Sequence, residues 1–381
     1  MPGILPKKLE IYMSKIPFVD LKAQYLGLKK EMDEAIFAVI EETSFIGGKV
    51  VKDFEMAFGQ LLGVNNVISC ANGTDSLYII MKSLGIGEGD EVITVANSWI
   101  SSSETISQTG AKPVFIDIDP VFLSMDLNQL EKKITQKTKA IIAVHLHGQM
   151  VDIEELKQIC EAHNLYLIED CAQAHLSTCN GKYAGTFGIA GSFSFYPGKN
   201  LGAYGDAGCI ITHDDELAIR CRMFANHGAL IKHSHEIEGI NSRLDSIQAA
   251  VLTVKLPHLI KWTEARRAIA NQYRFALKNI EQIQCVPEKN NTVHSYHLFI
   301  ILCERRDALK QHLAEVGIET SIHYPTPLPL LKAYKKYSYR EEEFPNAISA
   351  SKKILSLPMF PELTRAQIRI IADSIKQFYT K

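Results

Sequence analysis

Three short segments of this sequence combine residue types that could do chemistry. The first, Ala71–Asp75, reads ANGTD and lies between an expected strand and an expected helix. Free backbone N–H groups and the positive end of the helix dipole at such a junction suit a phosphate. One dipole contributes only about 0.3–1 kcal/mol, so a tightly held phosphate needs further donors. Taken alone, the segment is more typical of a capped turn.

The other two segments supply a carboxylate and an amine. Asp170 ends the apolar run LYLIED, which places it at the carboxyl edge of a buried strand, where ligands bind in open parallel sheets. An isolated buried charge is costly, so Asp170 must be paired or hydrogen-bonded, and a capping role fits it equally well. Lys199 lies in SFSFYPGKNLGAYGDAG, a glycine-rich, hydroxyl-bearing, aromatic loop after another strand. Most lone lysines are solvated surface groups, but a lysine in such a loop is unusual.

Pyridoxal 5′-phosphate accounts for these features together. This cofactor needs a lysine for a Schiff base, a carboxylate opposite the pyridine nitrogen, an anion cradle and an aromatic group against the ring. Other signatures are missing, because no G-x-G-x-x-G opens a helix and neither G-x-x-x-x-G-K-[ST] nor G-x-S-x-G occurs. His145 and His147 form an H-x-H without a third ligand at a recognisable spacing, so we favour hydrogen-bonded structural histidines over a metal site.

The elements that must position these residues alternate between strands and helices. Short apolar runs rich in β-branched residues predict strands that begin near residues 67, 91, 113, 140, 165, 192 and 208. Helical patterns lie between several of them, one over 72–84 and another after Asp152, whose spacing to Glu155 predicts a capping box. The alternation predicts an α/β fold with a large, doubly wound, mostly parallel sheet.

Beyond Val254 the pattern changes and predicts a smaller C-terminal α+β domain. It contains a long helix over 255–277, a strand within 294–302, a helix that stops at Gly317, and a last helix opened by Thr364 with Gln367 at a capping-box spacing. At the other end, apolar residues at helical spacing from 21 to 40 predict an amphipathic arm that covers a neighbouring core. We therefore divide the chain into a large domain over 1–254 and a small domain over 255–381.

Composition excludes several classes of protein. The 41 Lys and Arg residues nearly balance the 43 Asp and Glu residues, so neither a nucleic-acid binder nor a disordered chain is indicated. Eight cysteines without any C-x-x-C fit reduced, mostly buried thiols in a cytosol. The N-terminus has no apolar signal region, and no uncharged apolar run approaches the ~18 residues of a membrane span. We expect a cytoplasmic enzyme or binding protein.

Motifs distributed along almost the whole sequence make one family resemblance specific. They include SFIGG, ANGTDSL, DEVITVANSWISS, VHLHGQ, IEDCAQAH, SFSFYPGKNLGAYGDAG and GINSRLDSIQAAVL, in this order. With them the sequence resembles the DegT/DnrJ family of pyridoxal-phosphate-dependent nucleotide-sugar aminotransferases. The resemblance implies the aspartate-aminotransferase-like architecture known as fold type I.

The resemblance also implies roles for individual residues around the cofactor ring. Lys199 would form the Schiff base, and Asp170 would keep the pyridine nitrogen protonated so that the ring can act as an electron sink. Gln173 would lie near the ring hydroxyl. Trp99 matches an aromatic position that stacks on the ring, and we rank ordinary core packing below that role.

Further matches concern the phosphate and a second subunit. Gly73, Thr74 and Ser194 would bind the cofactor phosphate. Asn241, in GINSR, matches a residue that reaches the phosphate from the neighbouring subunit, so the resemblance implies a homodimer with a shared active site. Arg243 is a candidate substrate contact by position.

The implied reaction transfers an amino group from glutamate to a nucleotide-linked keto-sugar. His323 and Tyr324 of the HYP segment are expected sugar contacts. Lysine at position 199 favours transamination, because some relatives carry histidine there and dehydrate sugars. Similarity around PFVDLKAQY and NSRLDSIQAA favours C3 of a dTDP-linked 3-keto-6-deoxyhexose. Amination at C4, a UDP-linked sugar, a pyridoxal-phosphate-binding sugar dehydratase, a non-catalytic regulator and a sugar binder without the cofactor stay open.

The sequence departs from the family pattern at two places. Leu176 and Ser177 follow AQAH where glycine and a small residue are usual, which could alter packing beside Asp170. Pro329 replaces a common histidine, so the resemblance supports no sugar contact there.

Overall fold

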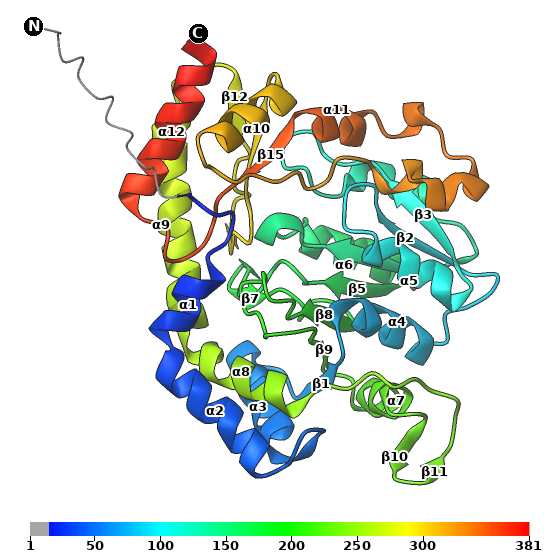
Figure 1. The fold of residues 1–381 in the computed structure, drawn as a ribbon. Helices are drawn as coiled ribbons and strands as arrows, with labels where there is room; N and C mark the ends of the chain where they lie inside the picture. Colours follow the sequence, from blue (N-terminus) through cyan, green and yellow to red (C-terminus); the bar gives the residue numbers. More distant parts are fainter. Residues whose placement is uncertain (1–14, 381) are drawn as a thin grey trace, which may run out of the picture.

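A seven-stranded sheet forms the centre of the structure, a computed structural model that describes residues 15–380 (Figure 1). The N-terminal stretch, for which we predict no signal segment, lies largely outside the described residues. No helix within 15–380 is both long enough and apolar enough to cross a membrane.

The strands of the large sheet coincide with the seven predicted apolar runs. In spatial order they are β1 (Asn66–Cys70), β9 (Gly208–Thr212), β8 (Ala190–Ser194), β5 (Tyr166–Asp170), β4 (Thr138–Val144), β2 (Glu91–Val95) and β3 (Lys112–Ile116). Only β9 runs antiparallel to its neighbours. Nearly all residues of these strands are buried, because helices cover both faces of the sheet. Burial on both faces favours β-branched residues along the whole of each strand. The predicted doubly wound α/β fold is confirmed.

The chain reverses its direction of travel across the sheet between β2 and β4. From β2 it passes through α5 (Ser101–Thr109) to β3, at one edge, and from β4 through α6 (Ile153–Ala162) back toward β5. Right-handed crossovers in opposite directions place these two helices on opposite faces. Helix α4 (Gly73–Ser83) packs between α5 and α7 (Asp215–Ala225). A ligand is expected at the carboxyl edge beside such a reversal.

The N-terminal arm consists of two helices, which corrects the single helix predicted over 21–40. Helix α1 (Leu21–Gly27) ends at Leu28, and α2 (Lys29–Glu41) continues in a new direction, as Figure 1 shows. Leu28 and Met32 are buried against Val251 of α8 (Ser246–Lys255). The arm therefore covers a small core of its own beside α8 and α3 (Gly48–Leu62).

The C-terminal part has the predicted α+β character with shifted boundaries. Pro257 lies in a 3-10 turn after α8, so the long helix α9 (Leu259–Leu277) starts later than predicted. Strands β12 (Ile283–Cys285), β14 (Phe299–Cys303) and β15 (Ile354–Leu357) form an antiparallel sheet. The predicted strand over 294–302 is regular only in β14. Helices α10 (Arg306–Glu315), α11 (Pro345–Lys353) and α12 (Arg365–Thr380) complete this part.

The two predicted capping boxes have different outcomes. At α12, Thr364 N donates to Gln367 Oε1 at 2.9 Å and Gln367 N donates to Thr364 Oγ1 at 3.3 Å, so that prediction is confirmed. Asp152 is the N-cap residue of α6, but its side chain accepts no capping bond. Its carboxylate binds Lys289 Nζ at 2.5 Å instead, so the predicted capping box with Glu155 is wrong.

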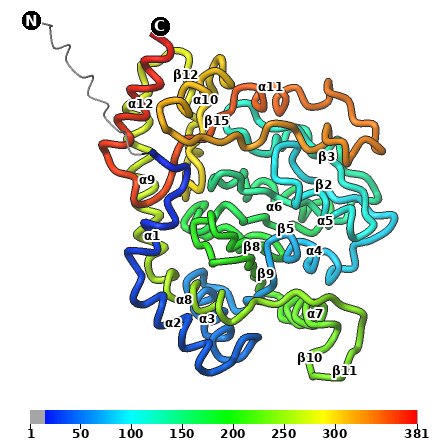
Figure 2. Tube along the Cα trace, in the orientation of Figure 1, coloured from blue at the N-terminus to red at the C-terminus, as the bar shows by residue number. Residues whose placement is uncertain are grey.

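A long segment of the C-terminal part returns to the large sheet, as Figure 2 shows for residues 325–345. Leu328 N donates to Ala96 O, and Tyr339 Oη donates to Pro113 O, both at 2.7 Å. The Asp117 carboxylate accepts the first N–H groups of α11 at 2.9 Å. These contacts bring the HYP segment to the carboxyl edge of the sheet. The hydrophobic cores share residues across position 254, so the predicted two-domain division stays a prediction.

Candidate active site

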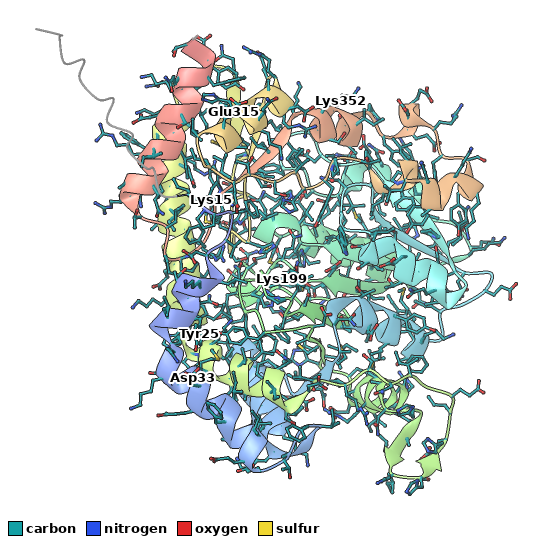
Figure 3. All side chains as sticks on the ribbon, in the orientation of Figure 1. Lys15, Tyr25, Asp33, Lys199, Glu315 and Lys352 are labelled. Carbon is teal, nitrogen blue, oxygen red and sulfur yellow. The ribbon has the colours of Figure 1, made fainter. Side chains whose placement is uncertain are left out.

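A cavity of about 440 Å³ opens at the carboxyl edge of the large sheet, and Figure 3 places Lys199 near the middle of the molecule. Its volume is typical of a site for a small molecule. Nine of the predicted site residues line it together, namely Gly73, Thr74, Trp99, Asp170, Gln173, Ser194, Lys199, His323 and Tyr324. They come from loops after β1, β2, β5 and β8 and from the C-terminal part, so the cavity exists only when all these elements are in place.

The first turn of α4 forms an anion cradle. Asn72 caps this helix with its side chain, and the first N–H groups of a helix have no partner within it. Ser194 packs so closely that a Cβ at Gly73 would lie 2.6 Å from the Cβ of Ser194. The hydroxyl groups of Thr74 and Ser101 lie 2.7 Å apart beside this turn. Hydroxyl and N–H donors therefore converge where the sequence predicts a phosphate.

Asp170 is held at the end of β5 with its carboxylate almost fully buried, at 6% exposure. Ser102 Oγ donates to one carboxylate oxygen at 2.8 Å, and the backbone N–H of Ala172 donates to the other at 3.1 Å. Both oxygens retain accepting capacity on the cavity side. The carboxylate can therefore accept a hydrogen bond from a protonated ring nitrogen. Sequence reasoning missed Ser102, although the serine run after β2 is a signal for it.

Lys199 lies in the loop after β8, half-buried, with its backbone N–H bound to Tyr196 O at 2.8 Å. Burial lowers the pKa of the Lys199 amine from 10.5 to about 8, and the nearby Asp170 charge acts in the opposite direction. The neutral amine is therefore far more abundant near neutral pH than in a surface lysine. A neutral amine is the form that attacks an aldehyde.

An aromatic and histidine wall faces the amine. Gln173 accepts the backbone N–H of His147 at 2.7 Å and donates to Tyr324 Oη at 3.1 Å. The Trp99 ring lies 5.9 Å from that of Tyr324 and is 59% exposed, so core packing does not explain Trp99. Burial and the Lys199 charge lower the pKa of His323 to about 4. At pH 7 this histidine is neutral and can hydrogen-bond but cannot attract a phosphate as a cation.

Two predicted site residues lie outside this cavity. Asn241 and Arg243 are exposed, and neither belongs to the lining of the cavity in this chain. Between them the Ser242 hydroxyl donates to the Asp75 carboxylate at 2.7 Å and accepts the Ala71 N–H at 3.1 Å. Because the Ser242 side chain is bound inward, its neighbours Asn241 and Arg243 face outward. Their predicted contacts with the phosphate and the substrate would therefore have to be made in the cavity of a second chain.

The two departures from the family pattern leave Asp170 undisturbed. Leu176 has a φ of +61°, a left-handed conformation that glycine adopts more easily. The Ser177 hydroxyl donates to Gly148 O at 2.7 Å and accepts from the Ser295 hydroxyl at 2.9 Å, which ties this turn to the C-terminal part. Pro329 is buried in a 3-10 turn and does not line the cavity.

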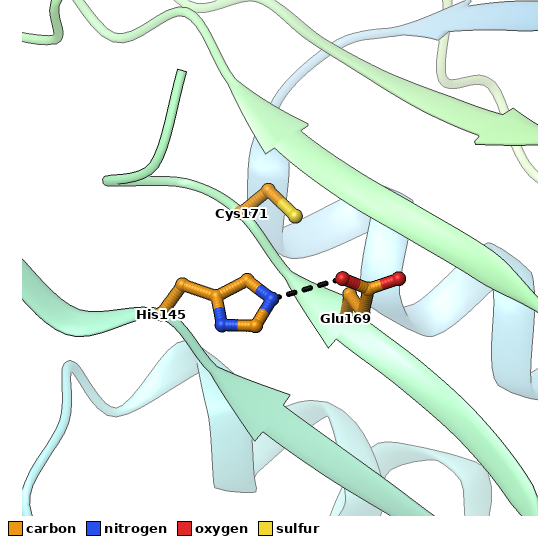
Figure 4. Close-up of side chains that lie close together, drawn as sticks. All are labelled: His145, Glu169 and Cys171. Atoms are coloured by element: carbon orange, nitrogen blue, oxygen red, sulfur yellow. Dashed lines mark hydrogen bonds and ion pairs between the residues drawn. The ribbon is translucent and has the colours of Figure 1, made fainter. Parts of the chain in front are cut away.

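His145, Glu169 and Cys171 form a buried polar cluster on the sheet, and Figure 4 shows the His145 ring directed at the Glu169 carboxylate. Glu169 accepts His145 Nε2 at 2.9 Å and three backbone N–H groups between residues 185 and 188 at 2.7–2.8 Å. His145 Nδ1 accepts the Val151 N–H at 3.3 Å. These bonds occupy both ring nitrogens of His145 and both oxygens of Glu169. The structural interpretation of the H-x-H motif stays a prediction.

Comparison with known proteins identifies the family. The profile of the DegT/DnrJ/EryC1/StrS aminotransferase family matches residues 27–376, and the chain belongs to this family. A pleiotropic regulatory protein of Geobacillus stearothermophilus is 44% identical over 96% of this chain and 98% of its own length. The dTDP-3-amino-3,4,6-trideoxy-alpha-D-glucose transaminase of Streptomyces venezuelae is 39% identical, with 96% of both chains covered.

The fold has a close counterpart among solved structures. The crystal structure of S. venezuelae DesV in complex with a ketimine intermediate superposes with a TM-score of 0.95, at 39% identity, over 97% of this chain and all of that one. The predicted fold type I architecture is thereby confirmed.

The depressed pKa of Lys199 predicts a distinctive reactivity. In cofactor-free protein, the rate at which Lys199 reacts with a limiting amine-modifying reagent should rise with pH, with a midpoint near pH 8. The reason is that burial disfavours the ammonium form. Mass spectrometry of the peptide that contains Lys199 measures the modification. Lys30, whose side chain is 84% exposed, is the internal control. A Lys199 curve that coincides with that of Lys30 contradicts the description of the site.

The close approach of Ser194 predicts that Gly73→Ala weakens phosphate binding. The added Cβ must push Ser194 away, and overpacking of this kind should reduce the affinity for pyridoxal phosphate at least about tenfold. Titration of cofactor-free protein with pyridoxal phosphate, followed by absorbance, measures the effect. Gly87→Ala is the matched control, because the nearest atom to its Cβ is 3.6 Å away. Unchanged affinity in Gly73→Ala would show that the phosphate lies elsewhere.

Proposed function

We propose that this protein is a pyridoxal-phosphate-dependent aminotransferase that moves an amino group from glutamate to a nucleotide-linked keto-sugar. The favoured acceptor is a dTDP-linked 3-keto-6-deoxyhexose aminated at C3. One observation carries the proposal: an amine, a buried carboxylate and an anion cradle converge in one cavity of a chain from this aminotransferase family.

The residues present fit the cofactor. Gly73, Thr74 and Ser194 would hold its phosphate, because they surround the free N–H groups of α4. Asp170 presents a buried carboxylate for the pyridine nitrogen, and Trp99 offers an exposed ring face for stacking. When bound, pyridoxal phosphate supplies an electron sink that stabilises negative charge at the carbon bearing the amino group.

Within this cavity the chain's own groups handle protons. The Lys199 amine would be the group that takes a proton from the reacting carbon and returns it, since its pKa of about 8 leaves both forms available near neutral pH. A positioned proton-transfer group of this kind typically accelerates a reaction by ~10²–10⁴-fold. Asp170, fixed by Ser102 and the Ala172 N–H, would hold the proton on the ring nitrogen.

The sugar would bind against the aromatic wall. Trp99 and Tyr324 offer ring faces, and neutral His323 offers hydrogen bonds, a combination that suits a sugar ring better than a charged group. The name of the S. venezuelae relative supports a dTDP-linked substrate and amination at C3. Amination at C4 and a UDP-linked sugar are the alternatives, because the cavity lining identifies no contact to a nucleotide base.

A homodimer would complete the site. Among the described lining residues Lys199 is the only lysine or arginine, and His323 is neutral at pH 7, so the phosphates and the glutamate carboxylates need cations from elsewhere. Asn241 and Arg243 are exposed beside Phe45 and Ile46, which are 46% and 52% exposed and are joined by backbone bonds to residues 245 and 246. This mixed apolar and polar surface supports a second copy that supplies Asn241 of the partner subunit.

A regulator without turnover is the second candidate function, because the relative from G. stearothermophilus is named a pleiotropic regulatory protein. An enzyme should convert glutamate to 2-oxoglutarate in the presence of a keto-sugar nucleotide, whereas such a regulator should release none.

Turnover on a substrate panel tests the proposed function. The purified protein should release 2-oxoglutarate from glutamate with a dTDP-linked 3-keto-6-deoxyhexose, more slowly or not at all with 4-keto and UDP-linked sugars. Lys199→Ala should lose nearly all of this activity, because it removes the amine that binds the cofactor and moves the proton. A protein that releases no 2-oxoglutarate with any sugar of the panel would refute the proposal.

Subunit complementation tests the shared site. Lys199→Ala and Asn241→Ala should each be impaired alone. If Asn241 serves the neighbouring site, their mixture should recover about a quarter of wild-type activity, because half of the dimers are mixed and each has one intact site. The control mixes Lys199→Ala with Asp170→Ala. Lys199 and Asp170 line the same cavity of one chain, so each site of a mixed dimer carries one of the two changes and no recovery is predicted. A Lys199→Ala and Asn241→Ala mixture that recovers no more activity than the control would place Asn241 in its own chain's site.

A further inference from the structure

A second buried lysine lies behind the loop that carries Lys199. Lys255, in the last turn of α8, is only 1% exposed. Its Nζ donates to the backbone carbonyl of Gly202 at 2.7 Å and lies 4.4 Å from the centre of the Tyr204 ring. Within residues 15–380 it has no ion pair, and the charge of Glu362 only partly offsets the effect of burial on its pKa. A buried ammonium without an ion pair is costly, so the contacts it does make are informative.

The loop it contacts is folded back on itself. Lys199 N donates to Tyr196 O, and Ala203 N donates to Phe195 O, both at 2.8 Å. A Cβ at Gly202 would lie only 2.3 Å from the carbonyl oxygen of Pro197, so the two arms of the loop touch at this glycine. Lys255 therefore binds the loop at the point where its returning arm packs on the outgoing one, three residues after Lys199.

Helix α8 anchors the returning arm at two positions. Gln248 accepts the Tyr204 N–H at 2.8 Å, and Lys255 follows Gln248 by seven residues, which places both on one face of the helix. On the other side, Asn200 donates to Ser295 O at 3.0 Å. Lys199 is thus flanked by anchored residues, and its own side chain is left free toward the cavity.

We propose that Lys255 is a positioning residue that fixes the loop of Lys199 through the Gly202 carbonyl and the Tyr204 ring. The inference rests on the proposed role of Lys199 and deepens it. Replacing the ammonium with an apolar group of similar length would leave the Gly202 carbonyl without its donor, so the returning arm should loosen and Lys199 should lose its fixed position. Burial lowers the pKa of Lys255 to about 8, so at pH 7 the donating ammonium predominates.

The test compares Lys255→Met with Lys289→Met. Lys289 is a matched control, because it is also buried at 7% exposure and lies 5.1 Å from an aromatic ring, but it binds Asp152 instead of the loop. Two quantities are measured at pH 7 in cofactor-free protein: hydrogen exchange of the amides of Lys199 and Ala203, and the rate at which pyridoxal phosphate is captured on Lys199 and fixed with borohydride.

Lys255→Met should speed the exchange of both amides and slow the capture, each by about tenfold or more, because small misplacements of a reacting group have large effects. Lys289→Met should change neither quantity, even if it lowers the melting temperature as much as Lys255→Met does. Lys255→Arg, which keeps a donor, should restore part of the protection. Unchanged exchange in Lys255→Met, or equal effects in Lys289→Met, would overturn the proposal.

A second pair of variants covers a Lys255→Met protein that does not fold. Tyr204 is 38% exposed, so Tyr204→Leu should fold and should speed the exchange of Ala203, whereas Tyr204→Phe keeps the ring and should not. Equal exchange in these two variants would contradict the ring contact. Amide exchange needs neither cofactor nor substrate, so a failure of the proposed aminotransfer would be separate from a failure of this inference.

Discussion

The site depends on one constraint, the partial burial of the Lys199 amine beside the buried carboxylate of Asp170. Burial pushes the amine toward its neutral form, and the carboxylate charge pulls it back toward the ammonium. The balance leaves both forms available near neutral pH. The seven-stranded sheet makes this possible, because it aligns the carboxyl ends of β5 and β8 and holds Asp170 and the Lys199 loop on the same edge. The cavity, the anion cradle and the aromatic wall are built around that pair.

The features that could be predicted from the sequence are those set by residues close together in the chain. The seven strands were predictable because burial on both faces demands continuous β-branched runs, and Asp170 was predictable because it ends one of them. The contacts of distant residues were not predictable. Leu28 interrupts the N-terminal arm where it packs on α8, and Lys289 takes the Asp152 carboxylate away from its cap. The support that Ser102 gives to Asp170 likewise appears only when β2 and β5 lie in one sheet.

The predicted site residues do not all lie in one place. The geometry brings nine predicted residues to one cavity, but Asn241 and Arg243 face outward on the surface that also exposes Phe45 and Ile46. The cavity of a single chain is poor in positive charge, and His323, which lines it, is neutral at pH 7. A site that must hold a phosphate, a nucleotide and glutamate is therefore incomplete in one chain, which is the physical argument for the proposed homodimer.

The central claim is that the amine at position 199, and no other, binds the aldehyde of the cofactor. Borohydride reduction of the holoenzyme followed by peptide mapping measures this directly. The account predicts one phosphopyridoxyl group per chain, on Lys199. The same group on another lysine, such as Lys255, or no covalent group at all in an active holoenzyme, would contradict it.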